Sequence, residues 1–336
     1  MQTELLEELK KLYRDGFPED SEPSVEWFFS RVLEENAMYF RASDVSTQII
    51  SAGYIMEKPA MLWGKHAEFP YLSALSTLFE YRGKGRIRPV IAGLLSRLYQ
   101  RKHPCCALYP FNHEYYKKYG FCDISFCTDK TSVGGKRYAE AIYLPDDVLP
   151  ASVLEELVRI QTEFAEPFHN RLRLGAKEIA DKRKEFSAES IPLCVYSDRG
   201  VPFAYCFKSN EKVYHYAASD LDKFLACEPL KGFSFADFYG STRPYVQGRI
   251  VNARVALKSA PYMPDFNQTV TLRVVDSMIA ENSRIFTVTK GNGTAMVRET
   301  DRFPDQTLDI AELTELLFIG DGKMIQKQKN IFTDQY

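Results

Sequence analysis

The segment 81–100, YRGKGRIRPVIAGLLSRLYQ, constrains the fold of this chain more than any other feature. Its apolar residues from Ile87 to Leu98 recur at the spacing of one helix face. The residues before it, AEFPYLSALST, alternate in the way that a strand requires. The sequence therefore predicts a strand, a basic glycine-rich loop and a core helix in direct succession.

The glycine loop fails to match two common phosphate-binding motifs. Gly85 is followed by Arg86 and Ile87, whereas a Walker loop needs Lys and then Ser or Thr. Arg88 stands where a dinucleotide fingerprint needs its third glycine. A loop that opens a helix can still bind an anion through unpaired backbone N–H groups. From the loop alone, an anion site and a solvated loop before a core helix both remain open.

Composition and charge exclude several classes of protein. The 336 residues include 43 Lys and Arg and 45 Asp and Glu, so we expect no broad positive surface for nucleic acid. No run of about 18 apolar residues predicts a membrane span. Seven cysteines without a C-x-x-C pair favour reduced thiols in a cytoplasm. The five histidines are scattered, which argues against a metal site.

The remaining pattern predicts mixed helices and strands. Residues 121–129 and 136–145 are expected to form a strand pair, and residues 151–186 a long helical segment. Three strands should follow before residue 219, separated by the turn signals SDRG and SNE. From residue 248 the chain is expected to be strand-rich, beginning with GRIVNARVALKS. A helix is predicted at LDIAELTELLFI, near the end.

The order of these motifs resembles the acetyl-CoA core of the GNAT N-acetyltransferases. LST at 75–77 is followed by YRGKGRI, a helix, LYP and YYKKYGF. Arg82 and Gly85 match the signature R/Q-x-x-G-x-G/A, while Ile87 replaces its last small residue. The combination with LYPFNHEYYKKYGF and with GRIVNARVAL downstream is similar to the enhanced intracellular survival (Eis) branch.

The resemblance implies an α+β protein of three parts. These are an N-terminal GNAT fold at 1–148, with a mixed sheet flanked by helices, a shortened GNAT-like middle at 149–247, and a sterol-carrier-protein-like α/β domain at 248–336. The implied reaction is acetyl transfer from acetyl-CoA to a primary amine, either a small cationic or aminoglycoside-like molecule or a lysine side chain. A homo-oligomer, a hexamer or smaller, is also implied.

The same resemblance assigns the cofactor site. The glycine loop is expected to hold the pyrophosphate of coenzyme A, and the preceding strand end to supply main-chain groups to the pantetheine arm and the thioester. The implied cofactor-binding residues are Leu75, Ser76, Thr77, Arg82, Gly83, Lys84, Gly85, Arg86, Ile87 and Asn112.

The match to Y-x-x-[YF]-G places Tyr116 at the family's general acid, with Tyr115 and Tyr119 as packing residues. A phenol with a pKa of about 10 can protonate a thiolate whose thiol has a pKa of about 8.5 once the two are positioned. In the Eis branch the general base is the chain's own terminal carboxylate. Here that group belongs to Tyr336.

Aromatic and acidic residues around the second helix form the expected acceptor site, because carboxylates and aromatic faces bind cationic amines. The same residues, at helical spacing, also fit a helix core. The implied substrate-binding residues are Asp20, Trp27, Phe28 and Tyr39, and Phe17 and Phe29 share the region.

Two alternatives to the acetyltransferase remain open at this point. One is a non-catalytic protein that binds coenzyme A or an apolar ligand. The other is a protein N-acyltransferase that uses a longer acyl-CoA.

Overall fold

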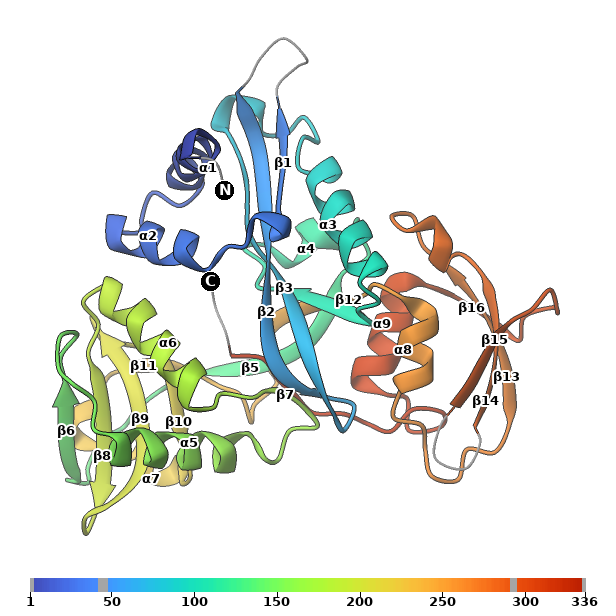
Figure 1. The fold of residues 1–336 in the computed structure, drawn as a ribbon. Helices are drawn as coiled ribbons and strands as arrows, with labels where there is room; N and C mark the ends of the chain where they lie inside the picture. The colour runs from blue at the N-terminus through green and yellow to red at the C-terminus, as the bar shows by residue number, and fades with distance from the viewer. Residues whose placement is uncertain (1–2, 42–47, 291–294, 334–336) are drawn as a thin grey trace.

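The computed structural model describes residues 3–41, 48–290 and 295–333. Among these residues, the N-terminal part contributes five of the 13 strands of a long mixed sheet and the helices on both faces of that region (Figure 1). The elements are α1 (Thr3–Gly16), α2 (Glu22–Arg31), β1 (Ala37–Arg41), β2 (Ile49–Leu62), β3 (Lys65–Thr77), α3 (Arg88–Gln100), β4 (Cys105–Leu108), α4 (His113–Lys117) and β5 (Cys122–Thr131).

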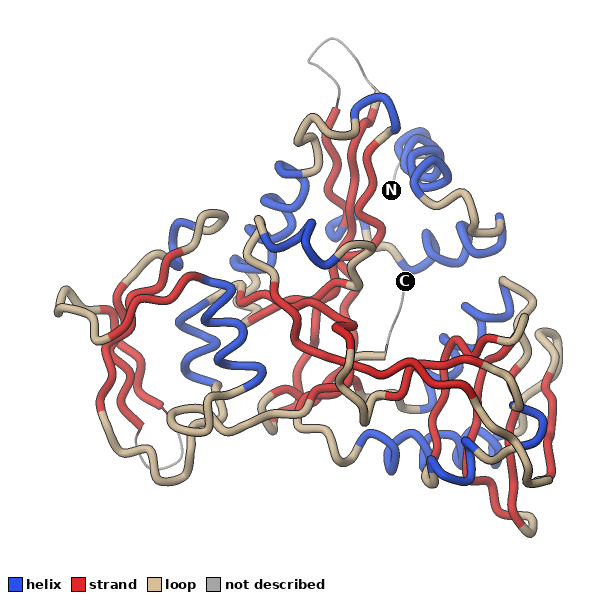
Figure 2. The backbone as a smooth tube through the Cα atoms, turned by 180° about the vertical axis from the view of Figure 1, so that it is seen from behind, coloured by secondary structure: helices blue, strands red, loops and turns tan. Residues whose placement is uncertain are grey.

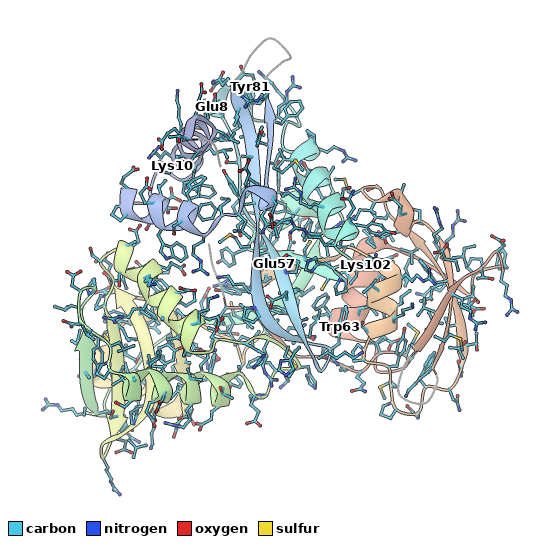
Figure 3. The ribbon with its side chains drawn as sticks, viewed as in Figure 1. Glu8, Lys10, Glu57, Trp63, Tyr81 and Lys102 are labelled. Carbon is cyan, nitrogen blue, oxygen red and sulfur yellow. The ribbon has the colours of Figure 1, made fainter. Side chains whose placement is uncertain are left out.

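The β2–β3 hairpin is the centre of this part, because two cores lie on its opposite faces. Leu9 and Leu12 of α1 and Phe28 of α2 pack on one face together with Tyr54. The apolar stripe of α3 packs on the other face, as its helical spacing predicts. The hairpin turns at Trp63, which is labelled in Figure 3 and donates its indole N–H to the carbonyl of Leu317 at 2.9 Å.

The middle part extends the same sheet. Its elements are β6 (Ala139–Tyr143), α5 (Ala151–Ala165), β7 (Asn170–Leu172), α6 (Ala176–Ala188), β8 (Leu193–Asp198), β9 (Val201–Ser209), β10 (Lys212–Ala218), α7 (Leu221–Leu225), β11 (Ser234–Asp237) and β12 (Arg243–Ile250).

The three predicted strands are confirmed as β8, β9 and β10, and they form an antiparallel meander. The predicted pairing of residues 121–129 with 136–145 is wrong. Strand β5 pairs with β11 and β12, whereas β6 pairs with β8 at the far edge of the sheet. The long helical segment expected over 151–186 is also divided, since β7 lies between α5 and α6 and pairs with β2.

Strand β12 lies between β4 and β5 and is antiparallel to both. A strand that follows the whole middle part therefore completes the N-terminal sheet. The predicted strand over 248–259 is wrong, because residues 248–250 end β12 and α8 follows it. The side chain of Asn252 starts this helix by accepting a hydrogen bond from the backbone N–H of Val255 at 3.1 Å.

The C-terminal part is a four-stranded sheet with two helices on one face. Figures 1 and 2 show these helices between the small sheet and the large sheet. The elements are α8 (Ala253–Ser259), β13 (Thr269–Val275), β14 (Ile285–Lys290), β15 (Ala295–Glu299), β16 (Gln306–Asp309), α9 (Ile310–Ile319) and β17 (Asn330–Ile331). The predicted helix near the end is confirmed as α9.

After α9 the chain returns to the large sheet, where β17 pairs in parallel with β7. The Asn330 amide donates hydrogen bonds to the carbonyls of Ile124 at 2.6 Å and Phe318 at 2.9 Å. Phe332 is fully buried and stacks on Phe69 with 4.7 Å between ring centroids. The last described residues are thus fixed in the core.

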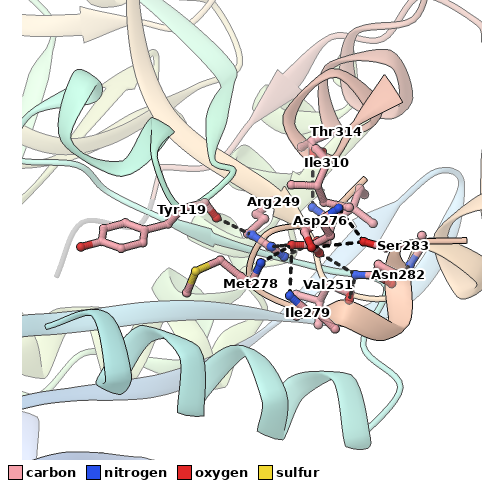
Figure 4. Close-up of polar contacts among 12 residues, drawn as sticks. Tyr119, Arg249, Val251, Asp276, Met278, Ile279, Asn282, Ser283, Ile310 and Thr314 are labelled. Atoms are coloured by element: carbon pink, nitrogen blue, oxygen red, sulfur yellow. Dashed lines mark hydrogen bonds and ion pairs between the residues drawn. The ribbon is translucent and has the colours of Figure 1, made fainter. Parts of the chain in front are cut away.

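A buried ion pair joins the C-terminal part to the end of α4 (Figure 4). The Arg249 guanidinium on β12 donates to Asp276 at 2.6 Å, to the Tyr119 carbonyl at 2.7 Å and to the Ile250 carbonyl at 2.8 Å. Asp276 also accepts from the Asn282 amide at 2.9 Å. Both members of the pair have fully buried side chains, so each is the other's counter-charge.

Removing one member of this pair should destabilise the protein strongly. We expect Asp276→Asn to lower the free energy of unfolding by about 3–5 kcal/mol, because it leaves a buried guanidinium without a carboxylate. The matched control is Glu299→Gln, since Glu299 lies half-exposed at 3.7 Å from Arg254. We expect it to change stability by less than about 1 kcal/mol. Denaturant unfolding followed by tryptophan fluorescence compares the two, and equal losses would contradict the expectation.

Candidate active site

The candidate site lies where β3 and β4 separate. These parallel strands pair at Tyr71 and Ala107, and β3 then continues to Thr77 without pairing with β4. The gap contains a pocket of about 80 Å³, which we call the Tyr116 pocket. It is lined by Phe17, Tyr71, Leu72, Ser73, Ala74, Leu75, Leu108, Tyr109, Phe111 and Tyr116.

A bulge in β3 shapes this pocket. Ala74 has a φ of 47°, which is unusual for a residue other than glycine, and the β2–β3 register shifts at the same place. Beside the bulge, the Leu75 side chain occupies the space over Gly53, where any larger residue would collide with it. Such strained backbone is typical of functional sites, where the surrounding structure holds it in place.

The predicted strand-end residues lie together at this edge. Leu75 lines the Tyr116 pocket, and Ser76 and Thr77 continue β3 while pairing with β2 on the other side. The Thr77 hydroxyl forms a hydrogen bond with that of Ser51. The edge of β3 that faces β4 is therefore available to an extended ligand beyond Tyr71, as in strand addition.

The glycine loop has the geometry of an anion site. Gly83 and Gly85 have φ values of 74° and 71°, and the space beside both is open. Among the described residues, the backbone N–H groups of residues 83–87 have no hydrogen-bond acceptor. The loop then opens α3, whose positive end favours an anion. Successive free N–H groups in such a turn form an anion-binding nest.

Arg82 and Ile87 have structural roles at the two ends of this loop. The Arg82 backbone N–H donates to Phe79, and its guanidinium donates to the Thr77 carbonyl at 2.9 Å and to Asp15. Arg82 therefore fixes the loop to the end of β3, and its backbone N–H is not available to bind an anion. Ile87 is buried in the core under α3, which explains a large residue at this position.

The other predicted loop residues lie at the surface. Lys84 donates to the Glu80 carbonyl at 2.9 Å, whereas the Arg86 and Arg88 side chains are exposed. The predicted contact residue Asn112 caps α4 by accepting from the Glu114 backbone N–H at 2.9 Å. This cap fixes the start of the helix that carries Tyr116.

Tyr116 lies on α4 and faces the pocket, with 5% of its surface exposed. Its ring packs edge-on against Tyr115 at 5.0 Å and Phe111 at 5.8 Å. Burial raises the pKa of the Tyr116 phenol well above its ordinary value, and the nearby Tyr115 and Tyr119 add to this shift. The phenol is therefore held in its protonated form.

The structure separates the predicted acceptor residues. Phe28 is a core residue, Asp20 accepts a hydrogen bond from the Tyr13 hydroxyl at 2.7 Å, and Trp27 lies under the Arg31 guanidinium. Tyr39 lies on β1, at the side of the sheet, beside Arg41. Of the aromatic residues predicted around the second helix, Phe17 lines the Tyr116 pocket.

A second pocket of about 400 Å³, which we call the Tyr216 pocket, shares Tyr109 with the first. Its residues come from β5, β10, β11, β12 and the chain end, including Thr333. The sequence did not predict it, because its lining comes from segments that are distant along the chain. The predicted base, Tyr336, lies outside the described residues.

Comparison with known proteins assigns the fold. The sequence model of the acetyltransferase (GNAT) domain matches residues 1–123, and that of the sterol carrier protein domain matches residues 253–322. The chain contains a GNAT domain and is an acyltransferase. GNAT proteins use an acetyl- or acyl-CoA donor and, in general, an amine acceptor.

Solved structures extend the similarity of fold over almost the whole chain. Eis1 from Mycobacterium abscessus has a TM-score of 0.71 and 14% identity, over 100% of this chain and 98% of its own. A GCN5-related N-acetyltransferase from Anabaena variabilis has a TM-score of 0.73 and 14% identity, over 100% of this chain and 98% of its own. A probable N-acyltransferase from Enterococcus faecalis has a TM-score of 0.73 and 17% identity, over 95% of this chain and 88% of its own. No curated protein sequence matches the chain.

The predicted α+β fold and its GNAT and sterol-carrier-protein-like domains are thus confirmed. The domain boundaries stay a prediction. Among the described residues, no helix is long and apolar enough to cross a membrane, and no three His, Cys, Asp or Glu side chains gather as metal ligands.

Glycine at position 85 should matter for the coenzyme A donor as well as for backbone strain. We expect Gly85→Ala to raise the KM for acetyl-CoA about tenfold, because alanine disfavours the positive φ that turns the loop amides outward. Gly64→Ala is the matched control, since Gly64 has a φ of 75° and open space in the β2–β3 turn. Steady-state kinetics should show the higher KM for Gly85→Ala alone.

Proposed function

We propose that this protein transfers the acetyl group of acetyl-CoA to a primary amine, with Tyr116 as general acid and the terminal carboxylate of Tyr336 as general base. The observation that carries the proposal is that the open amides of residues 83–87, the free edge of β3 and the Tyr116 phenol lie around one separation of strands. Acetyl-CoA supplies an activated thioester when bound.

The loop and strand residues would position this donor. The N–H groups of residues 83–87 would hold its pyrophosphate, and the free edge of β3 would bind its extended arm. A backbone N–H beside Leu75, next to the bulge at Ala74, would donate to the thioester oxygen, where negative charge develops. These groups are fixed by the fold, so little reorganisation is needed.

Tyr116 would donate its hydroxyl proton to the leaving sulfur. Burial raises the pKa of the phenol, which by itself makes it a weaker acid. The same burial raises the pKa of a thiol in that pocket. The pKa values of the phenol and of the thiol therefore stay close to each other, and proton transfer from Tyr116 to the sulfur remains feasible.

Replacing this acid should reduce turnover without weakening donor binding. We expect Tyr116→Phe to lower kcat by about 10²–10⁴-fold and to leave the KM for acetyl-CoA unchanged. Tyr115→Phe is the matched control, because Tyr115 packs edge-on against Tyr116. Assays of free thiol release with a polyamine, an aminoglycoside and a lysine peptide test this. Equal activity of the Tyr116→Phe variant and the wild type would exclude Tyr116 as the acid.

The raised pKa of Tyr116 also predicts how kcat/KM depends on pH in the alkaline range. An acid must be protonated to act, and a pKa raised above the ordinary value keeps this phenol protonated through pH 10. We therefore expect kcat/KM not to decline between pH 8 and pH 10. A decline in that range that is absent from Tyr116→Phe would contradict this assignment.

The path of the C-terminal segment supports the proposed base. Residues 330–332 are buried, and Thr333 lines the Tyr216 pocket, which shares Tyr109 with the Tyr116 pocket. A terminal carboxylate three residues farther along would be within reach of the reacting amine.

Extending the chain should therefore affect catalysis specifically. We expect one glycine added after Tyr336 to lower kcat about a hundredfold, because it displaces the base, and to leave the KM for acetyl-CoA and the thermal stability unchanged. One glycine added before Met1 is the control. Full activity of the C-terminally extended chain would assign the base to another group.

A further inference from the structure

The Tyr216 pocket leads away from the candidate reaction centre along a series of aromatic rings. Tyr109 contacts Tyr245 with 5.1 Å between centroids, Tyr245 contacts Phe238 at 4.9 Å, and Phe238 lies 6.4 Å from Tyr216. All four side chains line the pocket, and Tyr109 also lines the Tyr116 pocket. The pocket is thus an aromatic extension of the site.

The hydroxyl of Tyr216 is a polar group available to a ligand. Tyr216 is 3% exposed, and the Phe238 backbone N–H lies beside its hydroxyl oxygen. The hydroxyl proton has no acceptor among the described residues. A buried hydroxyl proton without an acceptor is costly, so a ligand atom that accepts its hydrogen bond would be favoured.

The charges of the pocket favour an anion. Its carboxylate, Asp129, already accepts two hydrogen bonds from Arg243, at 2.6 and 2.7 Å. His215 lies at 3.4 Å from the Tyr205 hydroxyl. Lys212 is exposed at the start of β10, and among the described residues it forms no ion pair. Among the described residues that line this pocket, the uncompensated charge is therefore positive.

We propose that the Tyr216 pocket binds the part of the acceptor remote from the reacting amine, and that the acceptor carries an aromatic ring and, beyond it, an anionic group. This inference rests on the proposed function, because the Tyr116 pocket must be where the amine reacts. A second cationic amine, as in the acceptors implied by the Eis resemblance, would face Lys212 and a carboxylate that is already paired.

The acceptor chemistry balances as a simple transfer. The amine nitrogen forms a bond to the acetyl carbon while the carbon–sulfur bond breaks. The amine gives one proton to the base, and the sulfur receives one from Tyr116. The Tyr216 pocket takes no part in these steps and acts on acceptor binding alone.

Three peptide amides that differ in the charge of one side chain test the inference: Gly-Phe-Glu, Gly-Phe-Gln and Gly-Phe-Arg. The amine of glycine is the acceptor, the ring fills the aromatic pocket and the third side chain faces Lys212. With the wild type we expect KM to rise in the order Glu, Gln, Arg, by about fivefold in total.

Two variants separate the roles of charge and hydroxyl. Lys212→Met should raise the KM of the Glu peptide to that of the Gln peptide, whereas the control Lys258→Met, an exposed lysine on α8, should leave the order unchanged. Tyr216→Phe should raise the KM of all three peptides alike without lowering thermal stability, since it removes a hydroxyl whose proton has no acceptor among the described residues. A KM order that Lys212→Met does not change would overturn the inference.

Binding of the acetylated peptides distinguishes this inference from the proposed function. These products need no turnover, so their Kd can be measured by calorimetry. If no amine is acetylated but the acetylated Glu peptide binds tighter than the acetylated Arg peptide, and Lys212→Met removes the difference, the proposed function fails and the binding site stands. If amines are acetylated but the two products bind equally, the inference fails and the proposed function stands.

Discussion

The buried guanidinium of Arg249 is the interaction on which the arrangement of this protein depends. A fully buried charge must be paired and hydrogen-bonded, and its partners come from three separate segments: Asp276 in the C-terminal part, Tyr119 after α4, and Ile250 in its own strand. A shift of any of these segments relative to the others would leave the guanidinium without some of its acceptors. Gly120 belongs to the same junction, since its positive φ and its closeness to Ile310 and Arg249 leave no room for a side chain. The end of the helix that carries Tyr116 is thereby fixed against the C-terminal part.

Strand β12 connects the buried ion pair to the candidate site. It separates β4 from β5 and carries Arg249, and its neighbour β4 leads to the aromatic residues of both pockets. The separation of β3 from β4 then leaves a free strand edge that the bulge at Ala74 and the loop of residues 83–87 complete. Backbone groups thus form most of the proposed donor site, whereas side chains form the proposed acceptor side. Donor binding should therefore tolerate side-chain changes better than acceptor binding does.

Motifs that are local in the chain could be predicted from the sequence. The strand, glycine loop and helix of residues 65–100 follow from periodicity and from glycine at two positions of positive φ, and α4 follows from its cap and from Gly120. Strand partners could not be predicted in the same way. The segment 121–129 pairs with β11 and β12, because their apolar faces meet across a sequence separation that local pattern does not encode. The helix α8 follows a capping asparagine inside a stretch rich in β-branched residues.

The sequence by itself determined the glycine loop that we propose for the donor, because an anion-binding loop depends on backbone conformation, and glycine positions specify that conformation locally. It also singled out Tyr116 as the proposed acid, through a motif of five residues. Only the tertiary structure decided the proposed acceptor side. The Tyr216 pocket draws on β5, β10, β11, β12 and the chain end, and its charge depends on whether Arg243 pairs with Asp129 or remains available. Such pairings are set by packing between distant segments, so charge counts along the chain do not reveal them.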